Sequence, residues 1–148
     1  MKTGEPLVYP PHYPPTDRWQ RFFLGVRWLG PDLSFFKRLA AQQKIRTSDL
    51  LDQWGGGARQ QVATEVSAVF ARKLRWSSKI FLPHDSVAVI AGGPRLGFID
   101  GDVDVAEAIA AIEAQLGITM AESFWQNAGS HTLGEIVDQL LAAGAVPA

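Results

Sequence analysis

The sequence predicts an all-α protein, and three observations support this prediction. Apolar residues recur every three or four positions in several long segments, the spacing of one buried helix face. Glycine and proline separate these segments, at residues 30–31 and most clearly in the run 55–57. Two helix-start signals of the form Thr-x-x-Glu stand at Thr119 and Thr132. A short strand over residues 87–90 is the weaker interpretation, because no partner strand is evident.

The N-terminal third should be an arm followed by three helices. Residues 1–15 hold five prolines and predict an extended, proline-rich arm. Thr16 is placed to cap a helix over about residues 17–29, a second should begin near Pro31 and end near Lys44, and a short third runs over residues 48–54. The glycine run then divides a helical extension, residues 16–56, from a helical domain at residues 57–144.

The C-terminal part predicts four further helices and one long loop. A helix from Ala58 carries an apolar stripe that ends at Leu74. Residues 75–101 are aperiodic but rich in apolar side chains, so this loop should be pinned to a core. The next helix, residues 103–116, ends at Gly117, a short helix follows Thr119, and the last runs from Thr132 to Gly144.

Composition narrows the class of protein. The chain has 148 residues, of which 47% are hydrophobic and 20% charged, as in an ordinary globular domain. No apolar run approaches the roughly 18 residues that span a bilayer, so no membrane role is expected. The chain has no cysteine and its first residues lack a signal-peptide core, which together favour the cytoplasm.

Charge is unevenly distributed along the chain. Residues 1–80 carry 13 Lys/Arg and 6 Asp/Glu (+7), whereas residues 81–148 carry 1 and 9 (−8). The basic half either meets an acidic partner or packs on the acidic half, and packing is the preferred interpretation. The aromatic residues among the arginines at residues 18–28 fall at helical core spacing, so nucleic-acid binding is not predicted.

The most acidic segment surrounds Asp100, Asp102, Asp104 and Glu107. A calcium loop starting at Asp100 would need glycine at its sixth position and glutamate at its twelfth, which hold valine and alanine. A catalytic carboxylate pair needs a pocket that separates the two pKa values, and the sequence indicates none. The ordinary interpretation is that Asp102 caps a helix whose positive N-terminal end favours Asp104 and Glu107.

The order of parts resembles an acyl carrier protein over residues 57–144. The resemblance is carried by a helix, a long loop, an acidic turn into a helix ending Leu116-Gly117-Ile118, a short helix, and a final helix TLGEIVDQLL. Gly101-Asp102-Val103 falls where the family has Asp-Ser-Leu. The phrases FLPHD and IDGDVD are also similar to a bacterial group of uncharacterised carrier-like proteins whose turn reads Gly-Asp-Asp-Ala. The resemblance implies a four-helix bundle, here with an N-terminal helical extension.

The departure at Asp102 determines the expected function. In the family, a serine hydroxyl at this turn receives phosphopantetheine, and aspartate has no hydroxyl to give. We therefore expect a non-catalytic, carrier-like interaction protein without cofactor, which recognises a protein partner through the acidic helix face of Asp100, Asp102, Asp104 and Glu107.

Two alternatives remain open. Asp85-Ser86-Val87 resembles the carrier motif, so Ser86 could carry phosphopantetheine, although Gly92-Gly93-Pro94 would interrupt the long helix that should follow. A small enzyme using the aspartates is the third interpretation, and no substrate class is indicated.

The three histidines lack ligand spacing, so no metal site is predicted.

Overall fold

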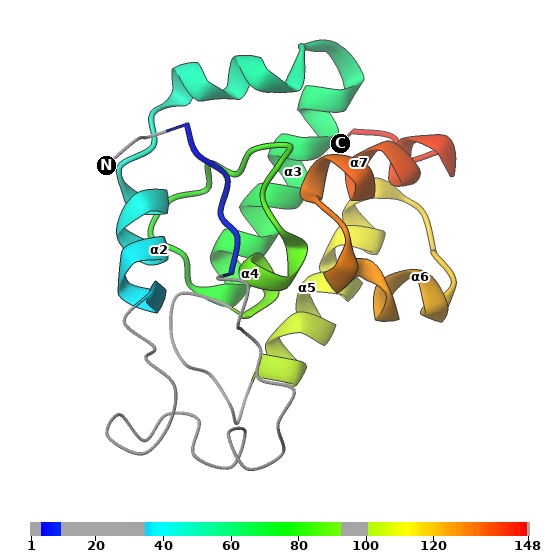
Figure 1. Ribbon diagram of the computed structural model, residues 1–148. Coiled ribbons are helices and arrows are strands. Elements are labelled where there is room, and N and C mark those ends of the chain that lie inside the picture. Colours follow the sequence, from blue (N-terminus) through cyan, green and yellow to red (C-terminus); the bar gives the residue numbers. More distant parts are fainter. Residues whose placement is uncertain (1–3, 10–34, 93–100, 148) are drawn as a thin grey trace.

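The computed structural model describes residues 4–9, 35–92 and 101–147, and for Gly92 and residues 101–103 it describes the backbone alone (Figure 1). Within these ranges the regular structure is helical, which confirms the all-α prediction, and pairing of the β type is limited to an isolated bridge between Ser86 and Thr132. The helices are α2 (Phe35–Lys44), the 3-10 helix η1 (Ser48–Trp54), α3 (Gly57–Leu74), α4 (Val87–Gly92), α5 (Gly101–Leu116), α6 (Glu122–Gln126), the 3-10 helix η2 (Ala128–Ser130) and α7 (Leu133–Ala142).

Most predicted helix boundaries are confirmed. The helix ending at Lys44, the short helix over residues 48–54 and the long helix from the glycine run to Leu74 are all present. Gly55 and Gly117 end their helices with φ of 81° and 68°, a conformation in which glycine has no side-chain penalty. The predicted helix at residues 17–29 and the start near Pro31 lie outside the described residues.

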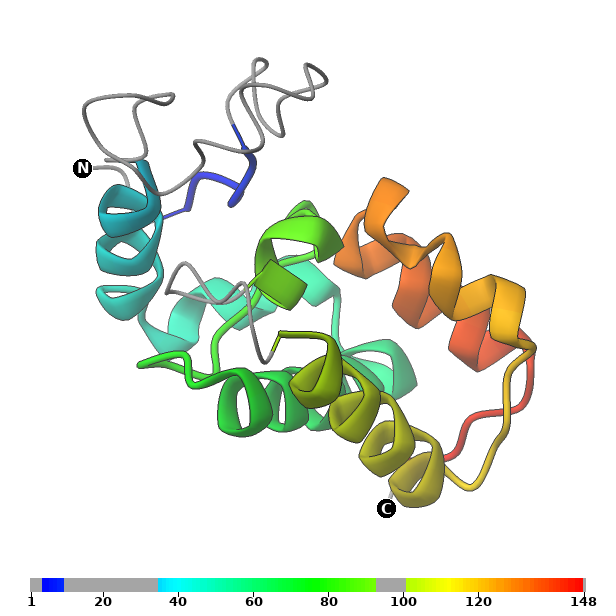
Figure 2. The same ribbon diagram turned by 90° about the horizontal axis from the view of Figure 1, so that it is seen from below.

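Helix α3 is the central element. It packs against α5 along one side and against α7, so that the three long C-terminal helices share one core (Figures 1 and 2). Their apolar faces supply the largest buried group: Val62, Val66, Val69, Phe70, Leu74, Ile112, Leu116, Leu133, Ile136, Val137 and Leu140. Burial of these side chains is the main force that holds the bundle together.

Parts of the N-terminal region enter the same core. Phe35, Phe36 and Leu39 from α2 and Trp54 from η1 belong to the hydrophobic cluster formed by α3, α5 and α7. Leu7, within the predicted proline-rich arm, is fully buried there as well. Segments 4–9 and 35–54 therefore pack directly on the predicted carrier-like domain.

The loop after α3 is pinned to the core, as predicted, but part of it is helical. Trp76, Phe81, Leu82 and Ile90 are buried, and the Trp76 indole N–H donates to the Ile90 carbonyl at 3.1 Å. Residues 87–92 form helix α4, so both an unbroken loop and the alternative strand over residues 87–90 were wrong. Val87, Val89 and Ile90 are all buried, a pattern that two-fold alternation does not explain.

The two predicted capping boxes have different outcomes. The prediction of a capping box at Thr119 is wrong, because α6 begins at Glu122 after Ala121 and has no side-chain cap. The box at Thr132 is confirmed: the Glu135 amide donates to the Thr132 hydroxyl, and the Thr132 amide donates to the Glu135 carboxylate at 3.1 Å. Two helical N–H groups that lack intrahelical acceptors are thereby satisfied.

The Glu135 cap predicts a pH dependence of stability. The hydrogen bond from the Thr132 backbone, then those from His131 and the Thr132 hydroxyl, lower the pKa of Glu135 below its ordinary value of 4.5. A depressed folded-state pKa contributes stability that is present above 4.5 and is lost as pH falls through the lowered value. We expect the difference in urea midpoint between wild type and Glu135→Gln to shrink between neutral pH and pH below 4.5. A constant difference across this range would contradict the assignment.

Ion pairs join the two oppositely charged halves of the chain. Arg46 pairs with Asp85 at 2.6 Å, Arg59 with Asp138 at 2.8 Å, and Lys73 approaches Glu107 to 3.9 Å. In each pair the cation comes from residues 1–80 and the carboxylate from residues 81–148. This supports the interpretation that the halves pack on each other. Among the described helices, none is long and apolar enough to cross a membrane.

Candidate functional site

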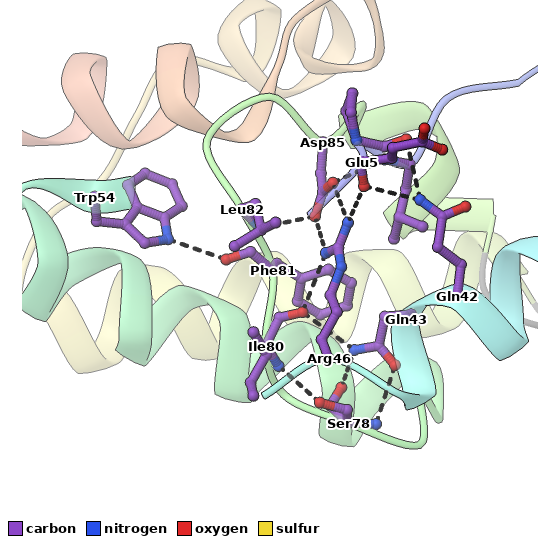
Figure 3. Close-up of polar contacts among 12 residues, drawn as sticks. Glu5, Gln42, Gln43, Arg46, Trp54, Ser78, Ile80, Phe81, Leu82 and Asp85 are labelled. Carbon is purple, nitrogen blue, oxygen red and sulfur yellow. Dashed lines mark hydrogen bonds and ion pairs between the residues drawn. The ribbon is translucent and has the colours of Figure 1, made fainter. Parts of the chain in front are cut away.

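The turn that carries Ser86 is organised by the buried carboxylate of Asp85 (Figure 3). Its Oδ2 receives the Leu82 amide at 2.8 Å and Arg46 Nη1 at 2.6 Å, while Oδ1 receives the Leu7 amide at 2.8 Å and Arg46 Nη2 at 2.9 Å. Both side chains of the ion pair are fully shielded from solvent. A carboxylate in this setting is held by two charged contacts and two backbone donors, which compensate for its desolvation.

Arg46 joins three segments of the chain. Beyond the Asp85 contacts, Nη2 donates to the Glu5 carbonyl at 2.8 Å and Nη1 to the Ile80 carbonyl at 3.3 Å. Its Nε is buried without an acceptor among the described residues. The guanidinium thus joins the N-terminal segment, the loop after α3 and the Asp85 turn through one rigid planar group.

Two glutamines at the end of α2 extend this network. The Gln43 amide oxygen receives the Ser78 amide at 3.1 Å and its nitrogen donates to the Ser78 carbonyl, while the Gln42 nitrogen donates to the Glu5 carbonyl at 2.8 Å. The Trp54 indole from η1 holds the Phe81 carbonyl at 3.0 Å. The N-terminal helical region therefore fixes the path of residues 78–85 through polar contacts (Figure 3).

The turn is also tied to the start of α7. The Leu133 amide donates to the Asp85 carbonyl at 2.8 Å, the Val87 amide to the His131 carbonyl at 3.1 Å, and the Gly134 amide to the Pro83 carbonyl at 2.8 Å. A Cβ added at Gly134 would lie 2.9 Å from that Pro83 oxygen. Glycine is required here because the backbones of α7 and the turn approach too closely for a side chain.

Ser86 lies immediately before α4 in this closed environment. Its amide donates to the Leu7 carbonyl at 2.8 Å, so residues 5–9 run alongside the turn, and its side chain is half-buried. Helix α4, which follows Ser86, is six residues long. Within the described residues, the helix that directly follows Ser86 is therefore no longer than six residues.

The described part of the predicted acidic face lies at the start of α5. Asp100 lies outside the described residues, and α5 begins at Gly101, so Asp102 occupies its first turn and is not the residue before the helix. Asp104 is half-buried and Glu107 is exposed. These two residues are three positions apart and therefore share one helix face.

Glu107 and Glu113, on the same helix, have different surroundings. The Glu107 side chain is 57% exposed, and its contact with Lys73 is long, at 3.9 Å. Glu113 Oε2 receives the Met120 amide at 2.6 Å and the Trp125 indole N–H at 3.3 Å, which holds the turn after α5. Glu113 is therefore a structural carboxylate, whereas Glu107 is available at the surface.

The sequence does not indicate that Arg46, Gln42 and Gln43 are partners of the loop. All three are buried, although polar residues at a helix end are usually solvated. A carboxylate buried in this loop would require a buried cation, but the sequence does not show that Asp85 is buried. No local pattern distinguishes Arg46 from the other arginines.

Among the described residues, no group of three or more His, Cys, Asp or Glu side chains is arranged to hold a metal ion. His131 contacts Glu135 at 3.2 Å, and His84 is exposed. Compared with protein-family models, curated proteins and solved structures, the chain shows no significant match.

Proposed function

We propose that this chain is a non-catalytic, acyl-carrier-like interaction protein that recognises a basic protein partner through the acidic face of Asp100, Asp102, Asp104 and Glu107. The order of α3, a pinned loop, α5, the short α6 and α7 supports the comparison with a four-helix carrier. Aspartate at position 102 supports a role without phosphopantetheine, because it lacks the hydroxyl that forms the phosphodiester.

The surface availability of Glu107 carries this proposal. Its long, exposed contact with Lys73 is of a kind that contributes little to stability, so a cation of a partner can replace Lys73 at small cost. Asp85 accepts four internal hydrogen bonds and Glu113 accepts two, so both carboxylates have partners within the protein. Asp104, one turn before Glu107, adds a second carboxylate to the same face.

The test is a comparison of retained partners between wild type and the double variant Asp104→Asn/Glu107→Gln. Exposed charge pairs contribute about 0.2–1 kcal/mol each, so neutralising two carboxylates should lower the affinity for a specific partner about twofold to thirtyfold, and binding by the wild type should weaken with salt. Glu122→Gln, a neutralisation of an exposed carboxylate on α6, is the matched control and should leave binding unchanged. Equal retention by the two variants would contradict the proposal.

A carrier modified at Ser86 is the second candidate, because Ser86 directly precedes helix α4. Against it, the Asp85 carboxylate is fully used inside the protein, and Leu7 lies against the Ser86 backbone. Intact mass after incubation with a phosphopantetheinyl transferase and coenzyme A separates the two candidates. We expect no mass gain; a gain that Ser86→Ala abolishes would establish the carrier function instead.

A further inference from the structure

A surface groove lies between η1, α3 and the non-helical residues 76–80. Its volume is about 640 Å³. The apolar side chains that line it come from all three elements: Leu51, Ala68, Ala71, Trp76 and Ile80. Leu51, Ala68 and Ile80 are half-buried, so the apolar lining of the groove remains partly accessible to solvent.

The α3 wall of the groove is made of short side chains. Thr64, Ala68 and Ala71 are separated by four and three positions and therefore share one helix face. Short side chains allow a second backbone to approach closely, and helices pack at interaxial distances of about 8–10 Å according to the residues between them. The wall therefore suits a helix lying along α3, between η1 and residues 76–80.

The rim of the groove is cationic. Arg72 and Lys79 are both exposed, and among the described residues that line the groove none is acidic. Arg72 lies in the last turn of α3, where a cation is stabilised by the helix dipole. Lys79 lies beyond α3, so the helix dipole does not explain a cation at this position. Its positive charge nevertheless lies at the same groove.

From this geometry we propose that the groove is a docking site for an acidic amphipathic helix of a partner protein. The apolar face of such a helix would cover Leu51, Ala68 and Ile80, and its carboxylates would meet Arg72 and Lys79. Helix-in-groove recognition combines these two features. The groove opens along its length to the exposed Ser48 and Ser77, which favours a helix over a small ligand that a pocket would enclose.

The direct test is an NMR titration of the isotope-labelled full chain with a synthetic amphipathic helix bearing leucine on one face and glutamate on the other. We expect shifts at the amides of Ala68, Ala71 and Ser78. Arg72→Glu/Lys79→Glu should weaken binding about tenfold at low salt, and Ala68→Leu should block binding because the larger side chain fills the space along α3. Lys37→Glu on α2 is the matched charge-reversal control and should have no effect.

Several outcomes would overturn the proposal. Equal binding of the same helix with lysine in place of glutamate would show that Arg72 and Lys79 do not select an acidic helix. Shifts caused by dodecanoate and not by the acidic helix would indicate a site for small anionic amphiphiles. Shifts that depend on protein concentration without peptide would indicate contact between copies of the chain, and the absence of shifts would exclude the site. These results are independent of the acidic face on α5, which Asp104→Asn/Glu107→Gln tests separately.

Discussion

Replacing Asp85 with alanine is expected to lower the free energy of unfolding by about 3–5 kcal/mol. The substitution leaves the Arg46 guanidinium buried without its counter-ion and removes the acceptor of the Leu7 and Leu82 amides. An unpaired buried charge is far more costly than a broken surface pair. Urea denaturation, monitored by tryptophan fluorescence, measures the effect.

The matched control for Asp85 is Asp138→Ala. Asp138 also pairs with an arginine, Arg59, but its side chain is 57% exposed. We therefore expect a loss of about 0–1 kcal/mol. The double variant Arg46→Met/Asp85→Leu should recover part of the stability lost in Asp85→Ala, because no charge remains buried. Similar losses for Asp85→Ala and Asp138→Ala would show that the buried pair does not hold the turn.

Replacing Leu7 with alanine is expected to cost about 2–5 kcal/mol, the range for truncation of a buried leucine. Leu7 is fully buried in the core, and its backbone bonds to both Asp85 and Ser86. The size of the effect depends on how far the surrounding core relaxes into the space left by the side chain. The free energy of unfolding from urea titration is again the measurement.

The neighbouring residue provides the control for Leu7. Val8 is 51% exposed, so Val8→Ala should change the free energy of unfolding by less than about 0.5 kcal/mol. A small effect at both positions would mean that residues 4–9 do not contribute to the stability of the bundle. A large effect at Leu7 alone would establish that part of the proline-rich arm belongs to the folded core.

Helices that depend on interactions between residues close in sequence were predicted more successfully than those that do not. Helices α3, α5 and α7 were predictable because apolar periodicity, the glycine that ends α5 and the capping box of α7 act within a few residues. Helix α4 was missed because its six residues are too short to show a helical period. The false box at Thr119 shows that the sequence pattern alone does not ensure that a helix begins at that residue.

The same distinction between local and distant interactions applies to the candidate functional residues. The acidic start of α5 could be identified from the sequence, because the residues concerned are close together along the chain. The Asp85 network could not, because its donors Arg46 and Leu7 lie 39 and 78 residues away. The sequence places Asp85 in the pinned loop, and only the fold shows that its carboxylate is buried.

The sequence by itself determined the helical class, most helix ends and the need for a pinned loop, because these depend on backbone preferences and on apolar spacing along one segment. Only the tertiary structure decided which polar groups are buried and which partners satisfy them. Burial of Asp85, Arg46 and Gln43 depends on contacts between segments far apart in the chain. A side chain's own neighbours in sequence do not reveal whether water or another segment will surround it.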